Sequence, residues 1–169
     1  MSKFKLFFHK LTHWEYWPYQ VLYLPVYFQY LYYVVRTQSF FFFNASNPTI
    51  KNGGFFMESK KEIYDLIPQE YYPKTILVAP DESLENILQK LTSENINFPL
   101  IAKPDIGLRG TAVKKINTTE ELASYHKKAK FNILLQDLIP YENEIGLFYV
   151  KLPNQHGKIT GIVSKEFMI

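Results

Sequence analysis

The sequence of 169 residues contains no cysteine, which excludes disulfide bonds and thiolate metal sites. Its four histidines are scattered without the spacing of metal ligands, so we expect no metal site and interpret them as surface or capping residues. The formal charge of +3 suits an anionic ligand but does not indicate nucleic acid, which usually requires a dense basic face. The basic, aromatic start is not followed by a small-residue cleavage site, so we expect a cytoplasmic location.

A hydrophobic content of 47% with 21% charged residues is enough for a packed core, in one ordinary domain or two small ones. The sequence has no internal repeats and no low-complexity linker. We predict a boundary in the proline-containing stretch between Asp65 and Pro80, which separates a leading region, residues 1–72, from a second region, residues 73–169.

The segment Trp14–Val35 is the most apolar part of the chain and is rich in tyrosine. It approaches the roughly 20 apolar residues that a membrane-spanning helix needs, but Pro18, Pro25 and three polar residues interrupt it. Three interpretations remain open: a buried or dimer-forming helical segment, a membrane-surface anchor with Lys10 and Arg36 near its ends, and a true span.

The rest of the leading region combines turn signals with one helix. Phe40–Phe43 predicts a short buried strand, and Asn44–Gly54 carries the Asn-Pro and Gly-Gly pairs of turns. Ser59 and Glu62 form a capping box that predicts a helix start. The expected apolar stripe of that helix consists of Ile63, Leu66 and Ile67.

The second region alternates short apolar runs with two helical patterns, one opened by Asp81 or Ser83 and one by Thr118 and reaching about Ala129. The order is β-α-β-β-α-β-β-β, which predicts an α+β fold with a mostly antiparallel sheet carrying helices on one face. The expected strands are Thr75–Val78, Leu100–Ala102, Ala112–Ile116, Ile133–Gln136, Ile145–Leu152 and Ile159–Lys165.

Lys103 closes the apolar run before a loop that contains Gly107 and Gly110. In a strand, Ile101 and Lys103 point to the same side, which would aim the ammonium into a covered cleft. A buried ammonium without an anion costs several kcal/mol or loses its proton, and a nucleotide phosphate would remove that penalty. The glycines, with Arg109 between them, would allow the loop to close over a phosphate. A plain hairpin with a solvent-facing lysine is the alternative.

Downstream, an apolar strand ends in Gln136-Asp137-Leu138-Ile139, and Glu144 begins the next strand. Such a strand end can hold adenine through backbone groups and apolar walls, and a following carboxylate can accept hydrogen bonds from ribose hydroxyls. The alternative is an ordinary hairpin turn with a solvated acid.

Together these motifs resemble the ATP-grasp superfamily of ATP-dependent carboxylate–amine ligases, which includes D-alanine–D-alanine ligase. The resemblance covers about residues 58–167 and rests on the order and spacing of Lys103-Pro104, the glycine loop, the helix at Thr118, the strand end at Gln136, and Glu144. It implies the small nucleotide-binding lobe of that fold, in residues 73–169, preceded by an aromatic-rich helical, substrate-side region.

The resemblance also implies site roles. Lys60 and Lys103 would contact the ATP phosphates, Glu144 would hold the ribose, and residues 107–111 would be the flap. The nucleotide-binding residues implied are Lys60, Lys103, Gly107, Arg109, Gly110, Gln136, Leu138, Ile139 and Glu144.

The implied activity is ATP-dependent activation of an unidentified carboxylate through an acyl phosphate, with no catalytic side chain assigned. The family's magnesium ligands lie in a later lobe, so we expect that lobe to be absent and Mg²⁺ to be needed only in a complete enzyme. The alternative function is a non-catalytic membrane-surface or nucleotide-binding module, with membrane contact through residues 14–35 and a homodimer as further expectations.

Overall fold

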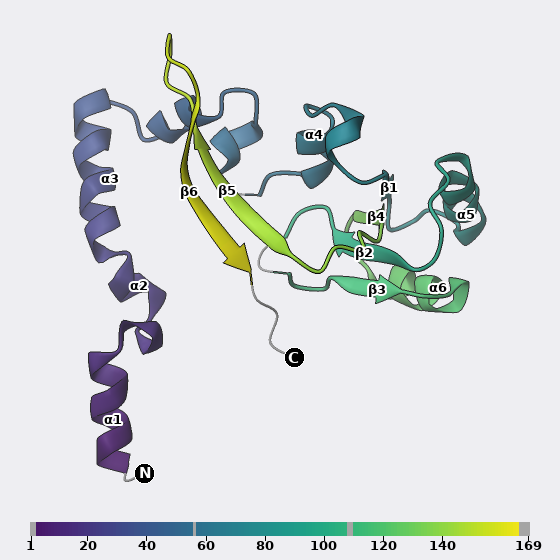
Figure 1. The fold of residues 1–169 in the computed structure, drawn as a ribbon, viewed down its shortest axis with the longest axis horizontal. Coiled ribbons are helices and arrows are strands. Elements are labelled where there is room, and N and C mark those ends of the chain that lie inside the picture. The colour runs from purple at the N-terminus through teal and green to yellow at the C-terminus, as the bar shows by residue number, and fades with distance from the viewer. Residues whose placement is uncertain (1–2, 56, 108–109, 166–169) are drawn as a thin grey trace. The chain divides into compact units, whose positions relative to one another are not determined.

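The computed structural model describes residues 3–55, 57–107 and 110–165 and divides the chain into two compact units (Figure 1). Unit 1 is residues 1–63 and unit 2 is residues 64–169, so the division falls inside helix α4 (Lys60–Tyr64). The predicted domain roles of residues 1–72 and 73–169 remain a prediction.

Unit 1 contains α1 (Lys3–Thr12), α2 (Tyr19–Leu22) and α3 (Leu24–Thr37). Neither α2 nor α3 has a buried residue, so the aromatic segment is helical with its side chains exposed. No helix among the described residues combines the length and the apolar character needed to cross a membrane.

The prediction of a short buried strand at Phe40–Phe43 is wrong. A 3₁₀ helix runs over Phe42–Ser46 instead, and Phe40 and Phe41 are 66% and 68% exposed. Gly53 lies buried in the following turn at φ 63°, where a Cβ atom would come within 2.7 Å of the Asn44 Cα. The turn chemistry expected for residues 44–54 is therefore present, and it leaves no extended strand for a partner to pair with.

Ser59 caps the start of α4 as predicted, because its Oγ accepts a hydrogen bond from the Glu62 backbone N–H at 3.1 Å. The helix nevertheless ends at Tyr64, and Leu66 lies outside it with 54% of its surface exposed. The expected apolar stripe therefore stops short of Leu66 and Ile67.

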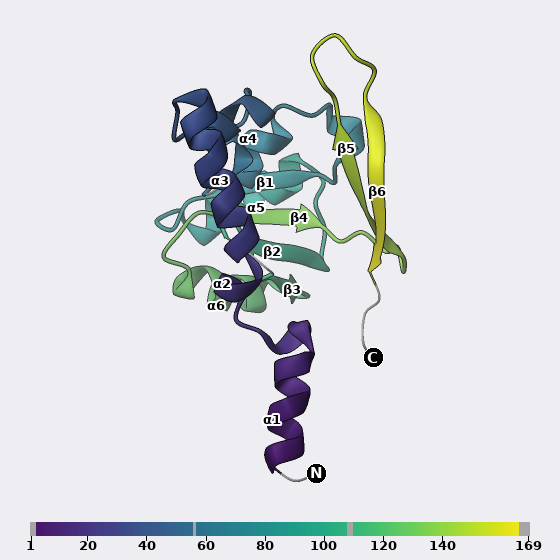
Figure 2. The same cartoon turned by 90° about the vertical axis from the view of Figure 1, so that its left-hand side faces the viewer.

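Unit 2 is built on a four-stranded sheet in the order β1-β4-β2-β3, in which every pair is antiparallel (Figure 2). The strands are β1 (Thr75–Val78), β2 (Leu100–Pro104), β3 (Lys114–Ile116) and β4 (Ile133–Asp137). The predicted α+β class with an antiparallel sheet is confirmed, although β3 is shorter than expected because Ala112 has φ 60° and belongs to the turn.

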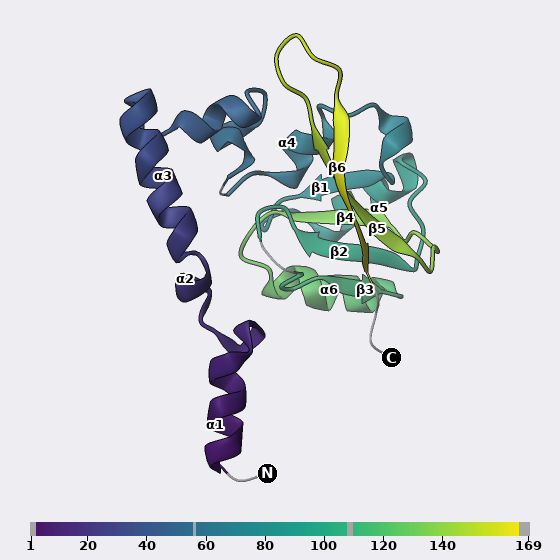
Figure 3. The ribbon, with the colours of Figure 1, turned by 60° about the vertical axis from the view of Figure 1, so that its left-hand side comes forward.

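Two capped helices cover one face of this sheet (Figure 3). Helix α5 (Leu84–Ser93) is capped by Ser83 rather than Asp81, and α6 (Thr119–Lys128) is capped by Thr118; each cap oxygen accepts a backbone N–H three residues on. The buried core between the helices and the sheet is apolar throughout. It consists of Ile76, Val78, Ile87, Leu91, Ile96, Leu100, Ala102, Ile116, Leu122, Ala129, Ile133 and Leu135.

The opposite face of the sheet is partly polar. Residues directly across an antiparallel pair share a face, and Ile101 pairs with Gln136 while Lys103 pairs with Leu134. Thr75 pairs with Gln136 on the other side of β4. Thr75, Lys103 and Gln136 therefore lie on the face away from α5 and α6.

The remaining strands, β5 (Glu144–Val150) and β6 (Lys158–Lys165), form a separate antiparallel hairpin (Figure 1). Every side chain of β5 is exposed, and a register irregularity lies between Phe148 and Tyr149. The predicted element order of unit 2 is thus confirmed from β1 through β6.

Candidate functional site

Lys103 is the centre of the polar face. Strand β2 alternates strictly: Leu100, Ala102 and Pro104 are buried, whereas Ile101 and Lys103 are half-buried on the other side. This is the alternation expected from the sequence, and it holds the lysine amine partly out of water on the face without helices.

The Lys103 ammonium donates two short hydrogen bonds. Its Nζ lies 2.9 Å from the Tyr64 hydroxyl oxygen and 2.7 Å from the Gln136 Oε1. The same nitrogen is 5.3 Å from the centroid of the Tyr64 ring, within the range of a cation–π contact. Both hydrogen-bond acceptors are uncharged.

These two acceptors are themselves held in place. Gln136 is 7% exposed, and its Nε2 donates to the Thr75 Oγ1 at 2.7 Å; the Thr75 hydroxyl in turn donates to the Pro73 carbonyl at 2.7 Å. The Tyr64 ring stacks on Tyr72 with a centroid separation of 4.8 Å and an interplanar angle of 6°. The lysine amine is therefore fixed by a connected polar network and an aromatic pair.

Lys103 forms no ion pair with any residue that the structure describes. An ammonium has three N–H donors, and the two hydrogen bonds to Tyr64 and Gln136 leave the third without a partner among the described residues. A partly desolvated cation with neutral neighbours is stabilised by an anion placed at that third donor. The site can therefore bind an anionic oxygen.

The glycine loop follows directly. Asp105, which is 5% exposed, fixes its start through a hydrogen bond from its backbone N–H to the Asn132 carbonyl at 2.9 Å. Gly110 has φ 71°, a left-handed conformation that favours glycine, with open space where a Cβ would be. Gly107 is exposed, and Arg109 lies outside the described residues. An exposed loop with open space at Gly110 is compatible with the predicted flap.

The far end of the loop is tied to α6. The Tyr125 hydroxyl donates to the Ala112 carbonyl at 2.7 Å. Burial raises the pKa of Tyr125, so the hydroxyl stays protonated and remains a donor at neutral pH. The described parts of the loop are thus anchored at both ends.

The other predicted site residues lie just after β4, at the start of β5 and in α4. Leu138 is half-buried and Ile139 is 47% exposed, both just after β4, and Glu144 is exposed at the first position of β5. Lys60 belongs to unit 1. The structure brings Lys103 and Gln136 into direct contact, and the roles of all the predicted site residues, including these two, stay predictions.

Two residues of the network were not predicted from the sequence. Tyr64 and Thr75 lie 39 and 28 positions before Lys103, so no local periodicity connects them to it. The available signal was the position of Thr75 at the start of a β-branched strand, where its hydroxyl had to face one side of the sheet. For Tyr64, the sequence offered only its place within the predicted capped helix.

The described part of the chain shows no cluster of metal-ligating side chains. No group of three His, Cys, Asp or Glu residues there is arranged to hold a metal ion. A shallow pocket of about 450 Å³ lies along α5, lined by Glu85, Leu88, Gln89, Thr92 and Ser93. This lining has one acid and no base, so it does not suit an anionic ligand.

Comparisons with known proteins found similarity only at the level of solved structures. No protein-family model and no curated protein matches the sequence. Among solved structures, D-alanine–D-alanine ligase from Helicobacter pylori is similar, with a TM-score of 0.49 and 16% sequence identity. The match covers 66% of this chain and 36% of the ligase chain. The chain therefore spans about a third of the length of that ligase.

Proposed function

We propose that unit 2 is the ATP-binding part of an ATP-dependent carboxylate–amine or similar ligase that works through an acyl phosphate. The observation that carries the ATP-binding part of this proposal is the Lys103 ammonium, fixed by two neutral acceptors and left with one N–H directed to no described partner. A phosphate oxygen at that donor would form a charge-assisted hydrogen bond in a partly desolvated place.

In this proposal the chain's own residues bind and orient. Gln136 and Tyr64 restrict the amine to one position, and the anchored glycine loop supplies backbone N–H groups near the same strand end. Leu138 and Ile139 would contact adenine, Glu144 would accept from the ribose hydroxyls, and Arg109 would add a phosphate contact. Lys60 belongs to unit 1, and its phosphate contact stays a prediction from the sequence. ATP would supply the phosphoryl group that activates a carboxylate.

The described residues include no group of three His, Cys, Asp or Glu side chains that could hold a metal ion, so this proposal assigns no step to Mg²⁺. A cytoplasmic location, a homodimer and membrane contact through residues 14–35 remain predictions.

The binding proposal is tested by isothermal titration calorimetry of ATP into the full chain and into Lys103→Met. Losing a charge-assisted hydrogen bond to phosphate should weaken binding at least about tenfold. The matched control is Lys127→Met, which removes an exposed lysine from α6, the helix on the other face of the sheet. ATP affinity of Lys103→Met equal to that of wild type would refute the proposal.

A second assay asks whether the chain alone carries ligase activity. ADP formation that depends on an added carboxylate and disappears in Lys103→Ala would show a ligase active without the metal-binding lobe that we expect to be absent. ATP binding without any carboxylate-dependent turnover, across a panel of carboxylates, is the result expected of an ATP-binding part alone.

A further inference from the structure

Helix α1 has one apolar face that is open to solvent. Its apolar residues follow the i, i+3, i+4, i+7 spacing of an amphipathic helix. These are Phe4, Phe7, Phe8 and Leu11, which are 72%, 62%, 49% and 54% exposed. Three exposed phenylalanines on one stripe form a continuous apolar surface of the kind that marks an interaction site.

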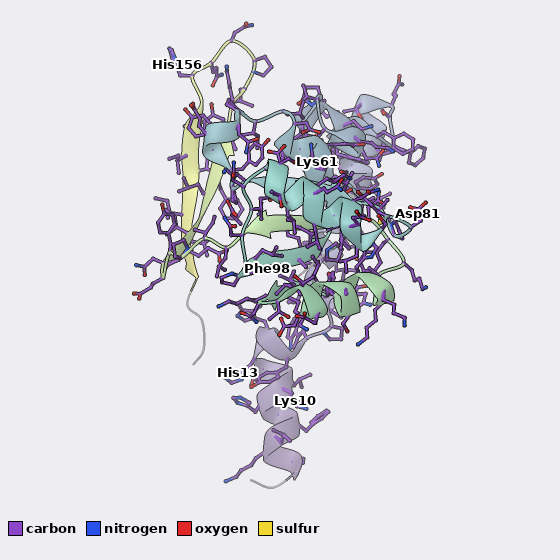
Figure 4. All side chains as sticks on the ribbon, turned by 90° about the vertical axis from the view of Figure 1, so that its right-hand side faces the viewer. Lys10, His13, Lys61, Asp81, Phe98 and His156 are labelled. Carbon is purple, nitrogen blue, oxygen red and sulfur yellow. The ribbon has the colours of Figure 1, made fainter. Side chains whose placement is uncertain are left out.

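The helix also carries basic side chains. Lys5, His9 and Lys10 lie between the apolar positions, together with Leu6, which is 43% exposed and outside the stripe, and the helix has no acidic residue. Figure 4 shows Lys10 and His13 extending from the end of the helix. In residues 1–37 the only acid is Glu15. The charge of this segment therefore complements an anionic surface.

This short helix requires something to cover its apolar face. A ten-residue helix is marginal in water, where helices of fewer than about 12–15 residues gain most of their stability from packing. Its last carbonyls are satisfied locally: the Thr12 hydroxyl donates to the Phe8 carbonyl at 2.9 Å, and the His13 Nδ1 lies 2.8 Å from the His9 carbonyl. Capping alone does not bury the phenylalanines.

The aromatic surface continues past α1. Trp14 is 64% exposed and Tyr16 is 56% exposed. The Trp17 Nε1–H donates to the Leu11 carbonyl at 2.9 Å, which ties this indole to the end of α1. Tryptophan and tyrosine concentrate at membrane–water interfaces, where an apolar ring and a polar group are both satisfied.

We propose that α1, together with Trp14 and Trp17, binds in the surface of a membrane that contains anionic lipid. The apolar stripe would enter the boundary between headgroups and acyl chains, and the basic side chains would contact the anionic headgroups. This inference goes beyond the proposed nucleotide binding and does not depend on it, because it involves unit 1 only.

The test uses the full chain with vesicles of phosphatidylcholine, alone or mixed with phosphatidylserine. The sequence has two tryptophans, Trp14 and Trp17, so intrinsic tryptophan fluorescence reports on this segment alone. We expect a blue shift and co-sedimentation with the mixed vesicles, weaker with phosphatidylcholine alone. Phe7→Asp should reduce partitioning at least about tenfold, because it removes an exposed phenylalanine that the membrane would bury and adds a charge.

The control is Phe148→Asp, which places the same substitution on a phenylalanine of β5 that is 59% exposed, close to the 62% of Phe7. It should bind vesicles like wild type. Lys10→Glu should lower binding to the mixed vesicles several-fold and leave binding to phosphatidylcholine nearly unchanged.

Three results would overturn the proposal. The first is a wild-type chain that binds neither vesicle, and the second is Phe7→Asp binding as strongly as wild type. The third is a wild-type oligomer, seen by sedimentation velocity without lipid, that Phe7→Asp dissociates while vesicles leave it intact. That last result would assign the apolar stripe to a second copy of the chain.

Discussion

The two faces of the four-stranded sheet in unit 2 use the same strands for different purposes. On the helix face, β4 contributes Ile133 and Leu135 to a core in which every buried member is apolar. On the opposite face, the neighbouring Leu134 is also fully buried, but Gln136 is bonded to a lysine and a threonine. Moving by one residue along β4 thus changes from the face that packs in the apolar core to the face that carries the hydrogen-bonded Gln136.

This difference shows where the polar residues are tolerated. A buried amide is costly unless its hydrogen bonds are made, and Gln136 makes one through its oxygen and one through its nitrogen. The lysine face can hold polar groups because they satisfy each other, while the helix face supplies the apolar burial that keeps the sheet folded.

The largest effect is expected on the helix face. Leu135→Ala should destabilise the protein by about 2–5 kcal/mol, because it removes a fully buried side chain and leaves a cavity in the core. Urea denaturation followed by circular dichroism measures the change. The matched control, Leu66→Ala at a side chain that is 54% exposed, should cost less than about 0.5 kcal/mol. Equal losses at both positions would mean that this face is not the core.

A smaller effect on stability and a specific effect on binding are expected on the lysine face. Gln136→Glu keeps the side-chain shape, but it places a carboxylate next to the Lys103 ammonium and replaces the amide donor to Thr75. The free energy of unfolding should fall by about 1 kcal/mol from the lost hydrogen bond, while ATP affinity falls at least about tenfold from charge repulsion and competition for the amine.

Calorimetry and urea denaturation of the same preparation check both parts of this prediction. Gln89→Glu, at an exposed position of α5, is the control for the added charge. Unchanged ATP affinity in Gln136→Glu would mean that the polar network does not take part in nucleotide binding. The two faces of the sheet would then differ only in how they contribute to stability.

The smallest effect concerns the cap of α6 on the helix face. The Glu121 carboxylate accepts hydrogen bonds from the Asn117 backbone N–H at 2.9 Å and from its Nδ2 at 3.2 Å. The backbone bond, with help from the Asn117 side chain and the Lys114 charge, holds the pKa of Glu121 below its ordinary value of 4.5. The ionised carboxylate therefore stabilises the fold above that pH, and this contribution disappears as the pH falls through the lowered folded-state pKa.

Glu121→Gln should remove this dependence. Urea denaturation should show wild type slightly more stable than the variant near pH 7, and the difference should shrink as the pH falls below the ordinary pKa of 4.5. A difference that stays the same size across this range would mean that the carboxylate charge does not contribute.

Much of unit 2 could be predicted because its signals are local. Ser83 and Thr118 mark helix starts through bonds to backbone groups three residues away, and the alternation in β2 assigns Lys103 to the face opposite Ala102. These patterns depend on side-chain chemistry within one turn or one strand, which the sequence displays directly.

The remainder depends on contacts between distant residues. The sequence suggested an anion partner for Lys103, with a solvent-facing lysine as the alternative. It did not show that Tyr64 and Gln136 would hold the amine, since those partners come from a helix end and another strand. Phe40–Phe43 had strand-like composition, yet it has no strand partner among the described residues, and its neighbours form tight turns. Composition suggests a strand, but pairing decides whether one forms.

The position of β4 has a consequence for how the chain acquires its fold. Strand β1 pairs within the four-stranded sheet with β4 alone, and the hydrogen bond between Thr75 and Gln136 spans 61 positions. During synthesis, β1 leaves the ribosome before β4 and stays unpaired until β4 has also emerged. The closure of such a long loop slows folding and leaves strand edges unpaired in the meantime. The four-stranded sheet is therefore completed late in synthesis, when β4 pairs with β1 and β2.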